Sequence, residues 1–173
     1  MKPFVIPAEL ERRLVARRGR LHAYDSYDAK KTAFVIVDMQ NFFMKDGELM
    51  CAPASREIVP AVTRLAQAVR DAGGIVVWVV MEATEESRDA WWNFHELFHP
   101  QAQDRRFNSL GKHGEGYRLW HEMQPHASDL TVVKKRYSAF VGGSSDIEQV
   151  LRARDIDTVL VGGVATNVCC EST

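Results

Sequence analysis

The chain has 173 residues, a mass of 19.6 kDa and a formal net charge of −1 at pH 7. This length fits a single domain, residues 1–173, and the 46% hydrophobic and 26% charged fractions are typical of a globular protein. The near-neutral charge gives no electrostatic reason to expect nucleic acid or an anionic membrane as a partner. Three cysteines, two of them adjacent, argue against a disulfide framework and predict a reduced, cytoplasmic setting.

The first 30 residues are expected to form an N-terminal extension. Residues 1–20 are basic but have no apolar core of signal-peptide length, and Glu9 and Glu11 argue against a transit peptide. Residues 7–20 predict a short basic helix whose apolar contacts are Leu10 and Leu14. We expect this helix to pack weakly or against a partner subunit. The longest apolar run, residues 75–81, is too short to span a bilayer, so no membrane association is expected.

Four apolar segments, rich in β-branched residues, predict strands buried on both faces: "TAFVIVDMQ", "GIVVWVVME", "LTVVKKR" and "DTVLVGGV". Two helical patterns lie between them. In the first, one face carries Ile58, Val59, Val62, Leu65, Ala66 and Val69 before a stop at Gly73 and Gly74. In the second, Ile147, Val150 and Leu151 follow a Ser145/Glu148 capping box. Strands that alternate with helices predict an α/β fold with a mainly parallel sheet.

Residues 82–124 break this alternation. The segment is rich in aromatic residues, histidine and glycine, with "WWNFHELFHP" at its centre. A long irregular insertion after a strand is commonly a lid or substrate loop, which is our expectation here. Its aromatic side chains are expected either to line a substrate pocket or to form a local core.

Three reactive residues fall where predicted strands end. Asp38 ends the first strand, Lys134 ends the third, and Cys169 follows the fourth. Singly, each has an ordinary structural reading as a turn residue, a solvated charge or a core residue. Parallel strands bring their carboxyl ends to one edge, where a thiol, a carboxylate and an ammonium make a nucleophile, a base and an electrostatic partner. A cysteine in the first turn of a helix beside a lysine is expected to have a lowered pKa. The adjacent Cys170 points about 100° around that helix and is expected to pack in the core.

Three segments, "VIVDMQNFF", "KKRYSAF" and "GGVATNVCCEST", resemble the signature segments of the isochorismatase-like cysteine hydrolases. The resemblance implies a three-layer α/β/α sandwich around a parallel six-stranded sheet and an Asp, Lys, Cys triad. By position, Asp38 is similar to the family's general base and Cys169 to its nucleophile. Lys134 is similar to its lysine because it precedes Tyr137 by three residues; Lys135 is the competitor for that role.

The resemblance also implies a mechanism. A cis peptide bond is expected between Val164 and Ala165, with the backbone N–H groups of Ala165 and Cys169 facing a developing oxyanion. The reaction implied is hydrolysis of a C–N bond through a cysteine acyl-enzyme, without a redox or organic cofactor.

Finer features favour one branch of the family. Isochorismatase itself works without a cysteine nucleophile, and nicotinamidases carry a metal-binding Asp-x-His segment where this chain reads "MEATEES". His95 and His99 have helical i, i+4 spacing, but no acidic or cysteine partner completes a site, so no bound metal is expected. The "NFH" and "KKRYSAF" blocks are most similar to ureidoacrylate amidohydrolases. A small amide or ureido substrate is therefore expected, with the following candidates for binding it: Asn41, Trp92, Asn93 and Tyr137.

Several alternatives stay open at this point. They are a nicotinamidase-like or isochorismatase-type hydrolase, a non-catalytic binding module of the same fold, and a redox sensor that uses Cys169 and Cys170 as a thiol pair. The family is often dimeric or tetrameric, so a homo-oligomer is expected. Family members continue beyond the cysteine with further strands, whereas this sequence supplies four. We therefore expect an apparent truncation on the C-terminal side, with the sequence as part of a longer chain.

Overall fold

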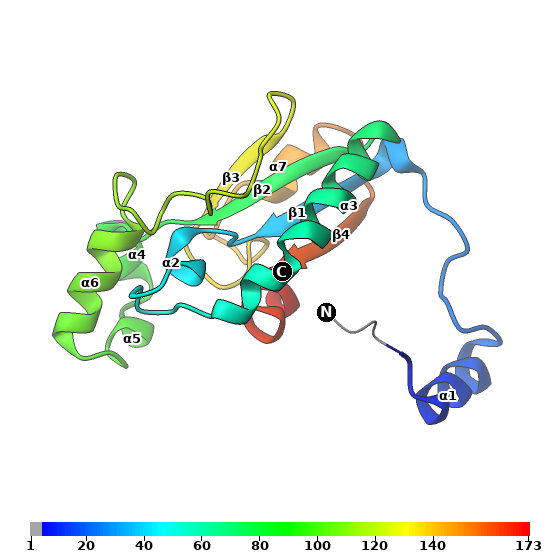
Figure 1. Cartoon of the computed structure of the whole chain (residues 1–173), viewed down its shortest axis with the longest axis horizontal. Helices are drawn as coiled ribbons and strands as arrows, with labels where there is room; N and C mark the ends of the chain where they lie inside the picture. Colours follow the sequence, from blue (N-terminus) through cyan, green and yellow to red (C-terminus); the bar gives the residue numbers. More distant parts are fainter. Residues whose placement is uncertain (1–4) are drawn as a thin grey trace.

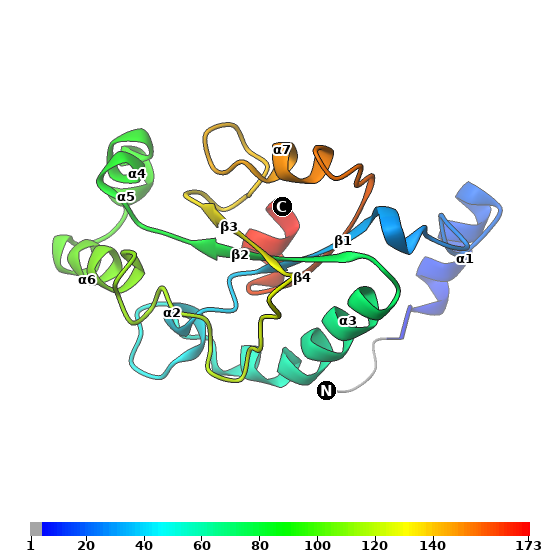
Figure 2. The ribbon, with the colours of Figure 1, turned by 90° about the horizontal axis from the view of Figure 1, so that it is seen from above.

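A computed structural model describes residues 5–173. Its centre is a parallel sheet of β1 (Thr32–Val37), β2 (Ile75–Met81), β3 (Leu130–Lys134) and β4 (Thr158–Gly163), in the order β3-β2-β1-β4 (Figure 1). Helix α3 (Val59–Asp71) covers one face, and α7 (Ile147–Arg152) covers the other together with the C-terminal turn (Figure 2). The predicted three-layer α/β/α architecture is therefore confirmed.

The central strands are buried as predicted, but β4 is not. All six residues of β1 are buried, because β2 and β4 pair with its two sides and helices cover both faces. Strand β4 pairs only with β1 among the described strands, and the side chains of Val159 and Val161 are exposed. The other edge strand, β3, buries Val132 and Lys134 but exposes Thr131. The prediction that all four strands are buried on both faces is therefore wrong for both edge strands.

The two predicted helices form with small differences. Helix α3 packs Val62, Ala66 and Val69 against the sheet, but Leu65, expected on the same face, is exposed. Helix α7 buries Ile147 and Leu151.

The predicted capping box at the start of α7 is not formed. Asp146 is the N-cap residue and makes no side-chain cap. The Ser145 hydroxyl instead accepts a hydrogen bond from the backbone of Ile147 (3.2 Å) and donates one to the carbonyl of Ala139 (2.7 Å). The serine therefore ties this helix to the loop after β3.

About half of the segment expected to be an irregular insertion is helical. It contains α4 (Glu85–Ala90), α5 (Trp92–His95) and α6 (Pro100–Leu110). Thr84 and Ser87 cap α4 reciprocally, and a proline opens α6, both of which are local helix-start signals. The three helices gather at the end of the molecule toward which β2 runs (Figure 1). The short α2 (Asn41–Met44) lies on the same side.

The predicted basic helix is α1 (Ala8–Arg18), and it buries no residue. It lies at the end of the molecule opposite α4–α6 in both views (Figures 1 and 2). Among residues 5–173, no helix is long and apolar enough to cross a membrane.

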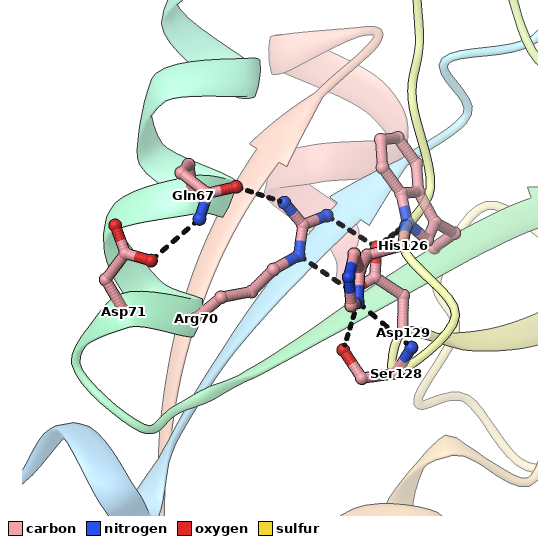
Figure 3. Close-up of polar contacts among 7 residues, drawn as sticks. Gln67, Arg70, Asp71, His126, Ser128 and Asp129 are labelled. Atoms are coloured by element: carbon pink, nitrogen blue, oxygen red, sulfur yellow. Dashed lines mark hydrogen bonds and ion pairs between the residues drawn. The ribbon is translucent and has the colours of Figure 1, made fainter.

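A buried ion pair fastens α3 to the entry of β3 (Figure 3). Arg70 donates two hydrogen bonds to the carboxylate of Asp129, at 2.8 and 2.5 Å. The same carboxylate accepts from the indole of Trp78 (2.8 Å) and from the backbone of His126 (2.9 Å). Four donors thus hold one carboxylate whose side chain is 2% exposed, and they link a helix, a central strand and a loop.

Candidate active site

The three reactive side chains meet at the carboxyl ends of the strands. The Nζ atom of Lys134 lies 2.8 Å from Oδ2 of Asp38 and 3.5 Å from Sγ of Cys169. It also donates to the carbonyl of Arg136 at 3.0 Å. The side chains of Asp38 and Lys134 are completely buried, and Cys169 is 4% exposed. The ammonium therefore sits between the carboxylate and the thiol, in a place closed to bulk water.

Strand alternation selects Lys134 over its neighbour. Val132 and Lys134 are two residues apart and both buried, on the face of the sheet that also holds Cys169. Lys135 lies one residue further and pairs with Glu86 at the surface. Only Lys134 of this pair contacts Asp38 and Cys169.

A left-handed backbone positions Asp38. Its φ of 52° breaks the extended geometry of β1, while its N–H still donates to Val79 of the neighbouring strand (2.9 Å). Gly163 at the end of β4 makes this corner possible, because a Cβ there would lie 2.1 Å from the carbonyl oxygen of Val37. Two strand ends are thus packed tightly just beside the carboxylate.

The thiol of Cys169 is protonated rather than activated in this setting. Burial and the nearby charge of Asp38 raise its pKa to about 12, and Lys134 offsets only part of that rise. The expectation of a lowered pKa is therefore wrong. The helix it assumed is a single π-helical turn, Thr166–Cys170, and the thiol lies in a closed, carboxylate-containing pocket. Burial also raises the pKa of Asp38, opposed by Lys134.

The turn before the cysteine has the predicted geometry. The peptide bond between Val164 and Ala165 is cis. The carbonyl of Ala165 accepts hydrogen bonds from the backbones of Val168 (3.2 Å) and Cys170 (3.1 Å), which closes the turn. The oxyanion role of the N–H groups of Ala165 and Cys169 stays a prediction. Cys170 is half-buried and packs against the α7 side of the core.

An aromatic cluster from α4–α5 and the loop after β3 adjoins these residues. Trp91 stacks on Phe94 with ring centroids 4.0 Å apart, and both rings meet Tyr137 edge-on, at 4.9 and 5.3 Å. Tyr137 directly follows Arg136, whose carbonyl accepts the hydrogen bond from Lys134. Burial raises the pKa of Tyr137, which the charge of Arg106 opposes.

The other candidates for substrate binding lie outside this cluster. Trp92 is 61% exposed, and the side chain of Asn93 accepts from the backbone of Phe94. The amide of Asn41 donates to the carbonyl (3.1 Å) and carboxylate (3.2 Å) of Glu115. Contacts of this kind hold loops in place, and the substrate role of these three residues stays a prediction.

Two buried polar residues of the insertion were not singled out as substrate ligands from the sequence. Arg106 of α6 is 6% exposed, and its guanidinium lies over the rings of Phe94 and Phe42. His95 of α5 is 3% exposed, and burial lowers its pKa. The sequence held one signal for Arg106: it stands four residues before the buried Leu110, on the apolar stripe of α6.

His95 and His99, spaced as if on one helix, belong to two elements. His95 ends α5, whereas His99 caps α6 by accepting from the backbone of Gln101. Within residues 5–173, no three His, Cys, Asp or Glu side chains are grouped as metal ligands. The absence of a bound metal stays a prediction.

Comparison with known proteins places the chain among hydrolases of this architecture. The isochorismatase domain model matches residues 32–173. Ureidoacrylate amidohydrolase RutB of Yersinia enterocolitica is 30% identical over 161 residues, covering 86% of this chain and 69% of the relative. The crystal structure of a cysteine hydrolase from Pseudomonas syringae superposes with a TM-score of 0.70 at 30% identity, over 85% of this chain and 65% of that one. N-carbamoylsarcosine amidase from Thermoplasma acidophilum gives a TM-score of 0.63 at 26% identity, over 83% of this chain and 73% of that one. The chain spans about two thirds of the length of these relatives.

Proposed function

Since the chain belongs to the isochorismatase family, we propose that it is a hydrolase that cleaves a C–N bond of a small amide, ureido or carbamoyl compound through a cysteine acyl-enzyme. The observation that carries the proposal is the contact of Lys134 with both Asp38 and Cys169 at the closed end of the sheet. A thiol, a carboxylate and an ammonium in contact provide the groups that nucleophilic acyl transfer needs.

The raised pKa values of Cys169 and Asp38 indicate which group accepts the thiol proton. Because the thiol is neutral in the resting site, it must lose its proton as it attacks, and the carboxylate of Asp38 is the base beside it. The sulfur forms a bond to the substrate carbonyl carbon, and the oxyanion is stabilised by the N–H groups of Ala165 and Cys169. Asp38 then returns the proton to the leaving nitrogen as the C–N bond breaks.

Water completes the cycle. Asp38 takes a proton from water, the hydroxide adds to the thioester, and the C–S bond breaks as Cys169 regains its proton. Lys134 contacts both groups and stabilises the negative charge on Asp38 and on the sulfur in turn. Both lie within 3.5 Å of its nitrogen, and the closed surroundings strengthen these interactions relative to water.

The relatives and the aromatic cluster support the proposed substrate class. One relative is named for ureidoacrylate and another for N-carbamoylsarcosine, and both compounds carry a carbamoyl group on nitrogen. The aromatic cluster of Trp91, Phe94 and Tyr137 beside the thiol suits a small planar group of this kind. We place the chain with the ureido and N-carbamoyl hydrolases on these grounds.

The domain limits, location and assembly belong to the same proposal. Residues 1–173 form one hydrolase domain in which residues 1–30 are an extension and 82–124 contribute to substrate binding. The three cysteines are free, in keeping with a cytoplasmic setting. A homo-oligomer, dimer or tetramer, is proposed by analogy with the family.

Ammonia or amine release from a panel of ureido acids, N-carbamoyl amino acids, simple amides and nicotinamide tests the activity. The parent chain is compared with Cys169→Ala and with Cys170→Ala, which removes the adjacent thiol. We expect turnover of at least one ureido compound, its loss in Cys169→Ala and its retention in Cys170→Ala.

Two results would contradict the proposal. Turnover that survives in Cys169→Ala would exclude the thiol as nucleophile. Hydrolysis of nicotinamide alone would move the chain to the nicotinamidase alternative.

A further inference from the structure

Arg106 is a buried cation without a counterion. Its side chain has five N–H donors, yet within residues 5–173 its one hydrogen-bond acceptor is the sulfur of Met81, at 3.3 Å. Nε is buried and has no partner, and no carboxylate of the described chain forms an ion pair with the guanidinium. Burying an unpaired charge is costly, so such a group is rarely retained for packing alone.

The guanidinium lies beside the candidate active site. Met81 is the last residue of β2 and is paired in register with Lys134 of β3. Phe94, whose ring the guanidinium faces at 5.3 Å, also contacts Tyr137. The cation is therefore held between the lysine-bearing strand and the aromatic cluster.

Electrostatics agree with this placement. Burial lowers the pKa of Arg106, and the charges of Tyr137, Asp38 and Cys169 oppose that change. In return, the positive charge of Arg106 favours ionisation of Asp38 and Tyr137. Burial and the positive charge of Arg106 also lower the pKa of His95.

We propose that Arg106 binds the carboxylate of the substrate, so that the enzyme selects small ureido acids over uncharged ureas. The inference rests on the proposed function and deepens it by assigning the acid-binding residue. A carboxylate offers the planar pair of acceptors that a guanidinium fork matches, and it would neutralise the buried charge. With its acid group held by α6, the substrate would present its carbamoyl end to Cys169.

The ordinary alternative is that Arg106 is a packing residue. The rings of Phe94 and Phe42 offer cation–π contact, at 5.3 and 5.9 Å. Such contact gives no acceptor to the N–H groups at the edge of the guanidinium, where the sulfur of Met81 is the one acceptor among residues 5–173 and Nε has none. A purely structural arginine would make the chain indifferent to the charge of its ligand, and this difference separates the two readings.

Equilibrium binding to a chain that cannot turn over is the first test. In the Cys169→Ala background, calorimetry compares 3-ureidopropionate with N-propylurea, in which a methyl group replaces the carboxylate. We expect 3-ureidopropionate to bind at least about tenfold more tightly, and Arg106→Gln to weaken its binding about 10- to 100-fold while changing that of propylurea by less than about twofold. Arg105→Gln is the matched control, because Arg105 neighbours Arg106 in α6 but is exposed and donates to the carbonyl of Gly47.

If the Arg106→Gln variant does not fold, Arg106→Lys is used in its place. It retains the buried charge but loses the fork, so binding of 3-ureidopropionate should still fall about tenfold with propylurea unchanged. Three outcomes would overturn the inference: equal weakening of both ligands, equal affinity of both ligands before substitution, or no binding of either. Charge-selective binding that depends on Arg106, without turnover by the parent chain, would instead reject the proposed hydrolysis and leave this inference standing.

Discussion

At the scale of single residues, the candidate site consists of three ionisable groups, with Lys134 in contact with both Asp38 and Cys169. Asp38 and Lys134 form a fully buried ion pair, and burial together with the charge on Asp38 raises the pKa of Cys169 to about 12. A neutral thiol is a poor nucleophile, so in the proposed mechanism Asp38 takes its proton as the substrate carbonyl is attacked. Such an arrangement protects the cysteine from oxidation in the resting state, because the thiolate is the species that oxidants attack.

The first prediction concerns alkylation of Cys169. Because its pKa lies at about 12, the rate of its reaction with iodoacetamide should rise about tenfold per pH unit between about pH 7 and pH 10, without a plateau. The measurement is the modified fraction of the peptide that contains Cys169, quantified by mass spectrometry over time.

The variant Asp38→Asn is a control in which the alkylation rate and the turnover should change in opposite directions. Removing the carboxylate lowers the pKa of Cys169, so alkylation at a fixed pH should speed up while turnover is lost. A plateau of the parent rate below about pH 8 would contradict the prediction and would indicate a stabilised thiolate.

The second prediction separates the two adjacent lysines. Lys134→Met keeps the volume but removes the ammonium that contacts Asp38 and Cys169, so kcat/KM should fall by at least about 100-fold. Lys135→Met removes a surface pair with Glu86 and should change kcat/KM by less than about threefold. Steady-state kinetics on both variants, with thermal melting to check folding, distinguish the two lysines. Similar losses in both would contradict the assignment of Lys134.

At the scale of elements, strand ends carry the site, and Gly163 sets their spacing. Its φ of +125° and the 2.1 Å approach of a Cβ to the carbonyl of Val37 leave no room for a side chain. We predict that Gly163→Ala lowers the free energy of unfolding by about 3 kcal/mol, since β4 must shift away from β1. Urea denaturation measures the loss.

Gly142→Ala is the matched control for Gly163. Nothing lies within 4 Å of a Cβ at Gly142, so this substitution should change the free energy of unfolding by less than about 0.5 kcal/mol. Equal effects at both glycines would show that the corner between β1 and β4 is less tightly packed than described.

The fourth prediction concerns the ion pair between α3 and β3. Burial alone would raise the pKa of Asp129, but hydrogen bonds from Arg70, Trp78 and the backbone of His126 lower it. The pair therefore stabilises the fold fully above the ordinary carboxyl pKa of 3.8, and this stabilisation is lost as pH falls through the lower folded-state value. Asp129→Asn should cost about 2–3 kcal/mol at pH 7.

Urea denaturation at pH 7 and below pH 4 tests this prediction. The stability difference between parent and Asp129→Asn should shrink at the acid end. Arg64→Ala, which removes an exposed arginine of the same helix, should have little effect at either pH. A difference that does not change with pH would show that the carboxylate contributes through shape rather than charge.

The strands, the central helices and the meeting of Asp38, Lys134 and Cys169 at one edge of the sheet could be predicted, because apolar runs and strand ends are visible in the sequence. The apolar runs specify β1 and β2. Side chains alternate between the two faces along β3, which directs Lys134 toward the thiol of Cys169. The exposure of β4, the capping of α7 and the helices of residues 82–124 could not be predicted in the same way. They depend on which neighbours pack against them, and the pKa of Cys169 depends on burial and on the charge of Asp38.

At the scale of the whole molecule, the sheet brings together residues 38, 134 and 169, and the insertion closes over them from one end. The opposite end carries α1, which stands apart from the sheet (Figure 1). Stability and chemistry therefore reside in residues from β1 onward, where both core clusters lie.

The last prediction follows from this division. Helix α1 buries no residue, and its Leu10 and Val15 are exposed, so removing it takes little apolar surface out of the core. A chain that lacks residues 1–20 should melt within about 2 °C of the parent when both are monomeric, because only burial lost from the core shifts the transition. Scanning calorimetry at low concentration measures this. Light scattering on the same pair tests the proposed oligomer, since loss of assembly with an unchanged monomer transition would assign α1 to the subunit contact, and a markedly lower transition would place α1 in the fold itself.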